Sequence, residues 1–240
     1  QSEETAARLS DLGANSVECF GNLKFAAEPL PVDPAALEKM QMVVAGRPLW
    51  LAASTHRGEE EFILAAHRRL IEIYPDLLTL IVPRHPERGG EVAALAADQG
   101  IASAQRSDGA GIDSATQVYI ADTIGEPGLF YRLVSVVYIG GSLVPTGGQN
   151  PLEAARLDCA LLHGPHMENF ADVMQSFEEH SASLTVTDAE TLAKAVGELL
   201  DDPARRGEMA ARAGEVVAGG TETLQKTLAK VEELLKEAAQ

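Results

Sequence analysis

Short apolar runs alternate with amphipathic segments along most of this chain. From Leu49 onward, each strand-like run is followed by a stretch with apolar residues at helical spacing. The pattern predicts strands over 49–53, 77–82, 102–106, 117–120, 135–139, 160–163 and 183–186. It predicts helices over 59–74, 87–99, 129–133, 151–157, 170–179 and 188–200. Repeated β–α alternation of this kind indicates an α/β fold, in which helices cover both faces of a parallel sheet.

The two ends of the chain depart from this alternation. Residues 2–12 read as a helix, 17–20 as a short strand and 22–33 as a proline-bearing linker, together typical of the tail of a preceding N-terminal domain. Residues 202–240 read as two helices separated by Gly219 and Gly220. We therefore expect three parts: a tail and linker over 1–33, a Rossmann-like domain over 34–201 and C-terminal helices over 202–240.

The last helix carries an apolar stripe, formed by Leu224, Leu228, Val231 and Leu235. A stripe at this spacing covers another surface in a folded protein. It therefore covers either this domain or a neighbour outside the chain, and it can drive self-association.

Composition narrows the possible partners. The chain has 240 residues, 45% of them hydrophobic, and a formal charge of −17, which argues against nucleic acid and anionic membranes as ligands. No apolar run is long enough to span a membrane, so we expect a soluble chain. The start at Gln1 is polar and has no signal-peptide pattern, and we expect a processed piece of something longer. Cys19 and Cys159 are far apart, which indicates a reducing cytoplasm rather than a disulfide framework.

The most informative segment is 139–153, IGGSLVPTGGQNPLE. Two glycine pairs bracket a short loop, and Asn150 and Glu153 follow at the start of a predicted helix. Glycines let backbone N–H groups approach a ligand, and a helix start adds unpaired donors. A phosphate or ribose site is therefore the leading hypothesis for this loop, while a capping role for Glu153 is the alternative.

Three further loops follow predicted strands, where ligands of such sheets bind. Ser54 and His56 lie in a segment that can hold an anion or merely cap a helix. Arg84 follows the second strand, where its guanidinium suits a phosphate or carboxylate; a surface ion pair with a nearby glutamate is the alternative. Gly125 and Glu126 form a turn that can accept from ribose hydroxyls or simply expose a carboxylate.

Other chemistries find little support in the residues. His163 and His166 flank a Gly-Pro pair but lack a third ligand, so we expect no metal site. The phosphate-binding patterns of dinucleotide oxidoreductases and P-loop NTPases are missing from the sequence. No nucleophile arrangement can be argued from spacing, and we identify no catalytic residue in this chain.

Five motifs taken together resemble a known family. The segments ASTHRGEEE, LIVPRHPER, ADTIGEPGLFY, VYIGGSLVPTGGQNPLE and LLHGPHMENF are similar, in order and spacing, to the C-terminal half of Kdo transferase (3-deoxy-D-manno-octulosonic acid transferase, glycosyltransferase family 30). The resemblance covers about residues 1–215. It implies the C-terminal, Rossmann-like domain of a GT-B fold, which in this family holds CMP.

The resemblance also implies a reaction and a place in the cell. The family transfers Kdo from CMP-Kdo to a lipid A precursor, with inversion and without a metal or other cofactor, in lipopolysaccharide biosynthesis. The parent enzyme would act at the cytoplasmic face of the Gram-negative inner membrane. Its acceptor site and glutamate base would lie in the N-terminal half, so we expect the isolated chain to be inactive.

By this resemblance the nucleotide contacts can be assigned to residues. They would be Pro83, Arg84, Ile124, Gly125, Glu126, Asn150, Pro151, Leu152 and Glu153, with His85, Gly141, Ser142 and Ser54 as weaker candidates. Gln149, Ile124 and Arg57 depart from the residues usual in the family. The partners would be CMP-Kdo or CMP, and a lipid A precursor through the missing half. Another GT-B glycosyltransferase, a sugar-nucleotide epimerase domain and a non-catalytic nucleotide-binding module are the alternatives.

Overall fold

A computed structural model describes residues 3–20, 25, 27–218 and 220–238 of the protein. The chain forms two compact units. One is the continuous stretch Pro29–Ala213, and the other combines Gln1–Glu28 with Gly214–Gln240. The first unit contains the whole sheet and every predicted ligand loop.

The sheet has seven strands, and each strand pairing is parallel. The strands are β1 (Leu49–Thr55), β2 (Leu78–Pro83), β3 (Ser103–Gln105), β4 (Val118–Ile120), β5 (Val136–Ile139), β6 (Ala160–His163) and β7 (Ser183–Thr185). Their spatial order is β3-β4-β2-β1-β5-β6-β7. The chain thus builds outward from β1 on one side and resumes at β5 on the other, which leaves a crevice at the carboxyl ends of β1 and β5.

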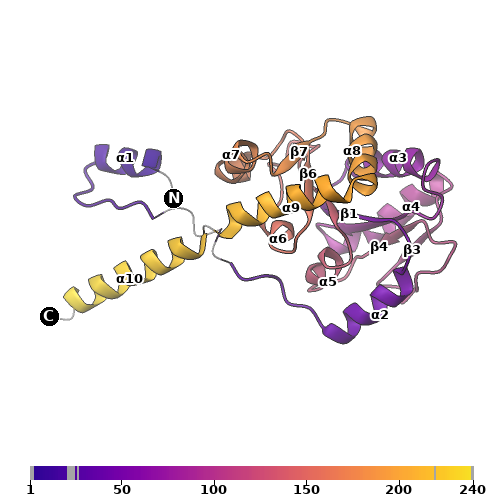
Figure 1. Ribbon diagram of the computed structural model, residues 1–240, viewed down its shortest axis with the longest axis horizontal. Coiled ribbons are helices and arrows are strands. Elements are labelled where there is room, and N and C mark those ends of the chain that lie inside the picture. Colours follow the sequence, from indigo (N-terminus) through magenta and orange to yellow (C-terminus); the bar gives the residue numbers. More distant parts are fainter. Residues whose placement is uncertain (1–2, 21–24, 26, 219, 239–240) are drawn as a thin grey trace. The chain divides into compact units, whose positions relative to one another are not determined.

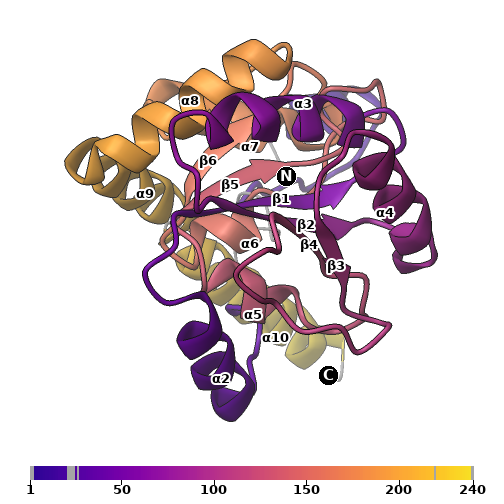
Figure 2. The same cartoon turned by 90° about the vertical axis from the view of Figure 1, so that its right-hand side faces the viewer.

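Helices cover both faces of this sheet, as predicted. The helices from Pro34 to Ala218 are α2 (Pro34–Val44), α3 (Glu60–Ile71), α4 (Gly89–Asp98), α5 (Pro127–Tyr131), α6 (Leu152–Ala155), α7 (Ala171–Glu179), α8 (Ala189–Asp201) and α9 (Pro203–Ala218), with short 3₁₀ turns at Pro86–Arg88 and Glu168–Phe170. Figure 1 shows the path of the chain through these elements. In Figure 2, α3 and α8 lie along one face of the sheet, and α5 and α6 lie along the other.

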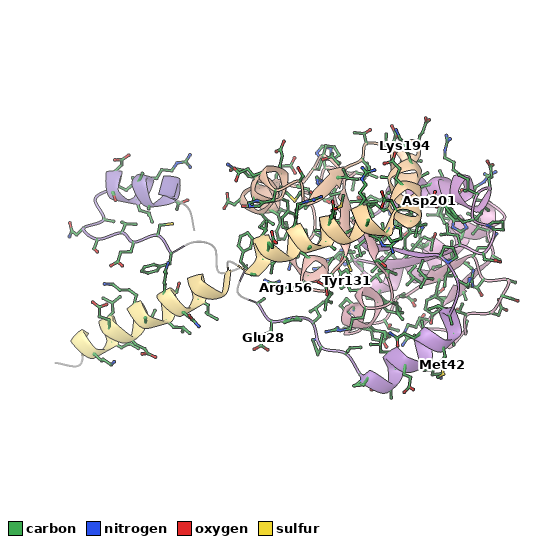
Figure 3. All side chains as sticks on the ribbon, in the orientation of Figure 1. Glu28, Met42, Tyr131, Arg156, Lys194 and Asp201 are labelled. Carbon is green, nitrogen blue, oxygen red and sulfur yellow. The ribbon has the colours of Figure 1, made fainter. Side chains whose placement is uncertain are left out.

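The core explains why these strands form. All four residues of β5 and of β6 are buried, because parallel strands with helices on both sides have no solvent face. Trp50 and Tyr138 are the largest side chains that are fully buried, and they pack with aliphatic residues of α3, α4 and α8. The side chains drawn in Figure 3 fill the space between the sheet and its helices. The predicted α/β class and all seven strands are confirmed.

Some predictions for the ends were wrong. Residues 17–20 are not a strand, because they pair with no other described segment. Helix α2 was missed, although Asp33 caps it by accepting from the Ala35 N–H at 3.0 Å and Pro34 begins it. Some of the predicted positions lie outside the described residues. They include Ser2 of the first predicted helix, residues 22–24 and 26 of the predicted linker, and Gly219.

The sheet unit continues past the predicted boundary at residue 201. Met209, Ala210 and Ala213 of α9 are buried, and Met209 belongs to the main core. The division of the chain at 33 and 201 into functional domains stays a prediction.

The second unit contains α1 (Glu3–Asp11) and α10 (Gly220–Ala238). Lys230 of α10 forms an ion pair with Glu18 at 2.9 Å. The predicted stripe on α10 is exposed, with Leu228 at 53% and Leu235 at 65%. Within the described residues, none of the helices is both long and apolar enough to cross a membrane.

Candidate functional site

Loops from four strands meet at the carboxyl edge of the sheet and enclose a pocket of about 500 Å³. We call this cavity the loop pocket. It is lined by Ser54 near the end of β1, by Val82 and Pro83 at the end of β2 and Arg84, His85 and Pro86 after it, by Thr123, Ile124, Gly125 and Pro127 after β4, and by Gln149, Asn150 and Glu153 after β5. The strand order brings these loops together, because β4, β2, β1 and β5 are neighbours in the sheet.

The β1 and β2 loops supply the cationic side of the pocket. Ser54 adopts a left-handed backbone with φ of 57°, at an irregularity in the pairing of β1 with β2. The Arg84 N–H donates to the Thr55 carbonyl oxygen at 3.0 Å, which fixes the start of the second loop. The Arg84 side chain is exposed, and no hydrogen bond or ion pair to it is found within the described part of the chain. Its guanidinium is therefore available to an anion in the pocket.

The β4 loop supplies an apolar surface. Ile124 is 87% exposed, an unusual exposure for a large aliphatic side chain. Gly125 beside it has a φ of 88°, which a residue with a Cβ rarely adopts. The turn therefore holds Ile124 out from the sheet, where a flat apolar group can pack on it.

Asn150 and Glu153 form the opposite wall. The Asn150 side-chain amide donates to Glu153 at 3.2 Å, and its oxygen accepts from the Leu152 N–H at 3.1 Å. Asn150 thus accepts from the first N–H of the short helix α6 and also holds the Glu153 carboxylate. Burial raises the pKa of Glu153, and the Asn150 hydrogen bond and the charges of Arg156 and Arg84 oppose this shift. Glu153 is therefore a carboxylate held beside the pocket without an ion-pair partner of its own at hydrogen-bond distance among the described residues.

Glu126 is placed differently from the prediction. Its carboxylate binds the Arg106 guanidinium through two hydrogen bonds, at 2.6 and 2.5 Å, and also accepts from the Thr123 hydroxyl. Arg106 lowers the pKa of Glu126 and so favours its ionised form. Glu126 does not line the loop pocket. Together with Arg106, it lines a different cavity. The interpretation of this carboxylate as a ribose acceptor is not supported by its placement.

The glycine loop is also placed differently. Gly141 has a φ of 68°, but its N–H and those of Ser142 and Leu143 donate to the buried carboxylate of Glu59. These donors are therefore not free for a phosphate, and neither Gly141 nor Ser142 lines the pocket. The loop is an anion-binding nest that the protein fills itself.

Pro151 and Leu152 are buried beneath the pocket and do not line it. Their positions are structural, because Leu152 packs into the core at the start of α6. The structure thus brings together Pro83, Arg84, His85, Ile124, Gly125, Asn150, Glu153 and Ser54 of the predicted set.

Thr123 and Gln149 were not among the predicted contacts, and His56 was predicted only as part of a segment that can hold an anion. Thr123 lines the pocket, and Gln149 lies 3.0 Å from His56 through their side-chain nitrogens. His56 in turn meets the ring of His85 edge-on, with centroids 6.0 Å apart. Burial lowers the pKa of His56. The sequence signal for Thr123 was its place in the loop that follows the predicted strand over 117–120, and His56 likewise lies in the loop after the first predicted strand.

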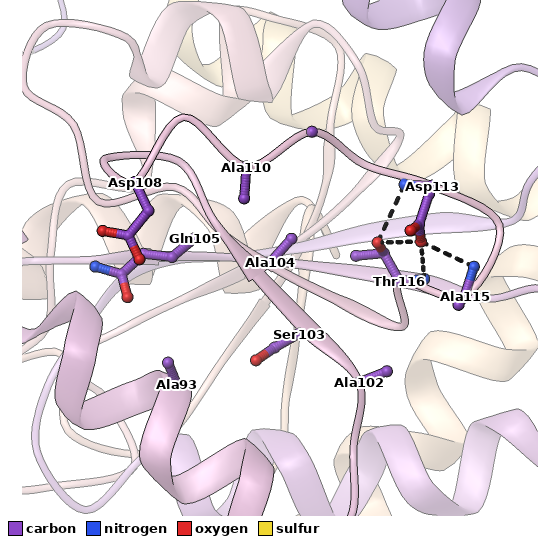
Figure 4. Close-up of a pocket in the computed structure, with 11 residues that line it drawn as sticks. Ala93, Ala102, Ser103, Ala104, Gln105, Asp108, Ala110, Asp113, Ala115 and Thr116 are labelled. Carbon is purple, nitrogen blue, oxygen red and sulfur yellow. Dashed lines mark hydrogen bonds between the residues drawn. The ribbon is translucent and has the colours of Figure 1, made fainter.

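A second cavity, of about 420 Å³, lies beside the edge strand β3 (Figure 4). Five alanines line it, and polar side chains lie at both ends: Gln105 and Asp108 at one, and at the other Asp113, which accepts from the N–H groups of Ala115 and Thr116 and from the Thr116 hydroxyl. The Asp113 carboxylate is thus used within its own turn, and none of the predicted site residues lines this cavity. Across the described residues, no three His, Cys, Asp or Glu side chains lie close enough to hold a metal ion, and the expectation of no metal stays a prediction.

Comparison with known proteins decides the family. The chain is 39% identical over 183 residues to the 3-deoxy-D-manno-octulosonic acid transferase of Haemophilus influenzae, covering 76% of this chain and 43% of that protein. It is 35% identical over 242 residues to that of Bordetella pertussis, covering 98% and 56%. The crystal structure of the C-terminal CMP-Kdo binding domain of WaaA from Acinetobacter baumannii superposes with a TM-score of 0.72 at 32% identity, covering 77% of this chain and 99% of that chain. The chain belongs to the Kdo transferase family.

Membership in the Kdo transferase family defines the architecture. The seven-stranded sheet is the C-terminal, Rossmann-like domain of a GT-B glycosyltransferase fold, as predicted. The chain spans about half the length of the curated Kdo transferases it matches. No protein-family model matches the chain.

Proposed function

We propose that the Pro29–Ala213 unit binds CMP-Kdo in the loop pocket and forms the donor-binding half of a Kdo transferase. One observation carries the proposal. Segments from three separate loops, at 83–85, 124–125 and 150–153, contribute to a single pocket at the crevice between the two halves of the sheet. The binding function named for the Acinetobacter domain supports the same ligand.

Each wall of the pocket suits one part of the donor. The exposed guanidinium of Arg84 suits the phosphate, because its planar donors match two phosphate oxygens. The exposed Ile124 offers an apolar surface to the cytosine ring. Asn150 and Glu153 can accept from the ribose hydroxyls, since Glu153 lines the pocket and accepts a hydrogen bond from the neutral side chain of Asn150.

The same groups assist the transfer step. As the bond between Kdo and CMP breaks, negative charge grows on the departing phosphate, and Arg84 stabilises it. The glutamate base and the lipid A precursor would belong to the half of the enzyme that this chain does not contain. The chain alone would then bind the donor without transferring it, and the parent enzyme would work at the cytoplasmic face of the inner membrane. No cofactor takes part in this scheme.

Calorimetry with CMP, UMP and UDP tests the proposal. We expect CMP to bind, and Arg84→Ala and Glu153→Ala to weaken it by about 1–3 kcal/mol each, since each removes a hydrogen-bonded charged group. Arg69→Ala and Glu61→Ala are matched controls, because both side chains are exposed on α3 away from the pocket. Tight binding of UDP without a response to CMP would refute the donor assignment.

The non-catalytic alternative is tested separately. In the full-length protein, a non-catalytic module would bind CMP and transfer no Kdo. A Kdo transferase would transfer it, and Arg84→Ala would slow that transfer.

A further inference from the structure

Glu59 is a buried carboxylate that the proposed function does not use. Its side chain is 0% exposed, yet no ion pair to it is found among the described residues. The neighbouring Glu60, equally buried, is neutralised by Arg88 at 2.7 Å. Burying a carboxylate is costly unless it is paired or fully hydrogen-bonded, so the contacts of Glu59 must compensate for the missing cation.

Five donors surround this carboxylate. One oxygen accepts from the His56 N–H at 2.9 Å and the Gly141 N–H at 2.6 Å. The other accepts from the N–H groups of Ser142 and Leu143, both at 2.9 Å, and from the Tyr138 hydroxyl at 2.6 Å. The donors are those of an anion-binding nest, and a carboxylate from 82 residues earlier in the chain occupies it.

These contacts join two loops that both line the loop pocket. The 54–59 loop carries Ser54, and the 140–149 loop ends at Gln149 beside Asn150. The loops also meet closely elsewhere: the Gly140 N–H donates to the Ala53 carbonyl oxygen at 2.8 Å, and Gln149 lies against His56. Without the Glu59 carboxylate, the N–H groups of Gly141 and Ser142 would lose their acceptor, and the Leu143 N–H would keep only its longer contact with the Tyr138 hydroxyl at 3.2 Å.

We propose that Glu59 is a positioning residue of the donor site, which acts as a built-in anion that locks the 140–149 loop to the 54–59 loop. The lock places Ser54, Gln149 and Asn150 on the pocket wall before the donor arrives. It also keeps the glycine loop from binding the donor phosphate, which leaves that task to Arg84. The inference rests on the proposed function of the loop pocket.

The experiment compares Glu59→Ala with Leu199→Ala in the whole chain. Leu199 is fully buried on α8, outside the pocket, so its truncation destabilises the same unit without touching either loop. We expect Glu59→Ala to weaken CMP binding about tenfold or more, and Leu199→Ala less than about twofold, at a temperature where both remain folded. Sodium formate, which can fill the vacated nest, should restore part of the CMP affinity in Glu59→Ala, whereas sodium chloride should not.

Amide hydrogen exchange provides a readout that does not need a ligand. Residues 140–150 should exchange at least about tenfold faster in Glu59→Ala than in Leu199→Ala, because local opening no longer costs the carboxylate contacts. Equal exchange in the two variants, or equal CMP affinities, would overturn the inference. If the wild type fails to bind CMP, the proposed function is wrong and the exchange rates still decide the role of Glu59.

A milder variant covers the case in which Glu59→Ala does not fold. Tyr138→Phe removes one donor from the Glu59 carboxylate, together with the longer contacts of that hydroxyl with the Leu143 N–H and the Ser142 hydroxyl, and leaves the ring in the core. Amide hydrogen exchange over residues 140–150 is expected to be faster than in the wild type in this variant too. Unchanged exchange would contradict the proposal that Glu59 holds the two loops together.

Discussion

His67 makes the stability of this protein depend on pH in a direction that can be calculated. The side chain lies on α3 and is fully buried, and its Nδ1 is 2.8 Å from the Thr79 hydroxyl on β2. Burial, and secondarily the charge of Arg47, lower its pKa from 6.5 to about 4. The folded protein therefore holds the neutral imidazole at pH values where the unfolded chain is already protonated.

The sign and size follow from this pair of pKa values. Because the folded pKa is depressed, the contribution of His67 is present above pH 6.5 and is lost as the pH falls from there toward 4. The full difference of about 2.5 pKa units corresponds to roughly 3 kcal/mol, at about 1.36 kcal/mol per unit. Between pH 7 and pH 5, His67 alone should cost about 2 kcal/mol of unfolding free energy.

Urea unfolding of the wild type and of the double variant His67→Leu/Thr79→Val measures this contribution. The variant removes the titrating group and its hydroxyl partner together, so no buried polar group is left unpaired. Both proteins should lose unfolding free energy between pH 7 and pH 5. The loss should be about 2 kcal/mol larger in the wild type, because only the wild type contains His67. Parallel pH profiles for the two proteins would refute the argument, since every other titrating group is common to both.

Three further changes have expected results. Arg88→Ala leaves Glu60 buried without its cation and should cost about 3–5 kcal/mol in urea unfolding; a loss below about 1 kcal/mol would contradict the contact. Gly140→Ala forces a Cβ onto the Ser54 carbonyl oxygen and should weaken CMP binding and lower the melting temperature, and normal values for both would disprove the close approach. Cys159 is fully buried, and burial raises its pKa to about 12, so a disulfide reagent should reach this thiol only in denaturant; rapid labelling of the native protein would show otherwise.

The strands were predictable because each is a local run whose burial shows in its own residues. Val136–Ile139 and Ala160–His163 are apolar enough to need cover on both faces, whatever the rest of the chain does. The false strand over 17–20 shows the limit of this reasoning, because a strand also needs a neighbour to pair with. Helix α2 was missed because it begins directly after the predicted proline-bearing linker, although Asp33 and Pro34 together form a helix start.

The pocket was predictable to the level of its loops. Polar residues directly after parallel strands gather at one edge, and the resemblance to the Kdo transferase family identified Arg84, Ile124, Asn150 and Glu153 among them. Which way each side chain points was not predictable, because the partner that decides it is distant in sequence. Glu126 turns away to a guanidinium 20 residues earlier in the chain.

The sequence by itself determined the α/β class, the order of the elements and the loops that reach the ligand edge, because these depend on hydrophobic period and on connections between successive elements. Only the tertiary structure decided which group the N–H donors of the glycine loop between Ile139 and Asn150 bind. A loop rich in N–H donors binds an anion, but the spacing of residues along the chain does not determine whether that anion is a ligand phosphate or a carboxylate of the protein. Here the fold brings the carboxylate of Glu59 to Gly141, so the N–H donors of the loop bind a side chain of the protein itself. Arg84, which lines the pocket, is then the group proposed to bind the phosphate.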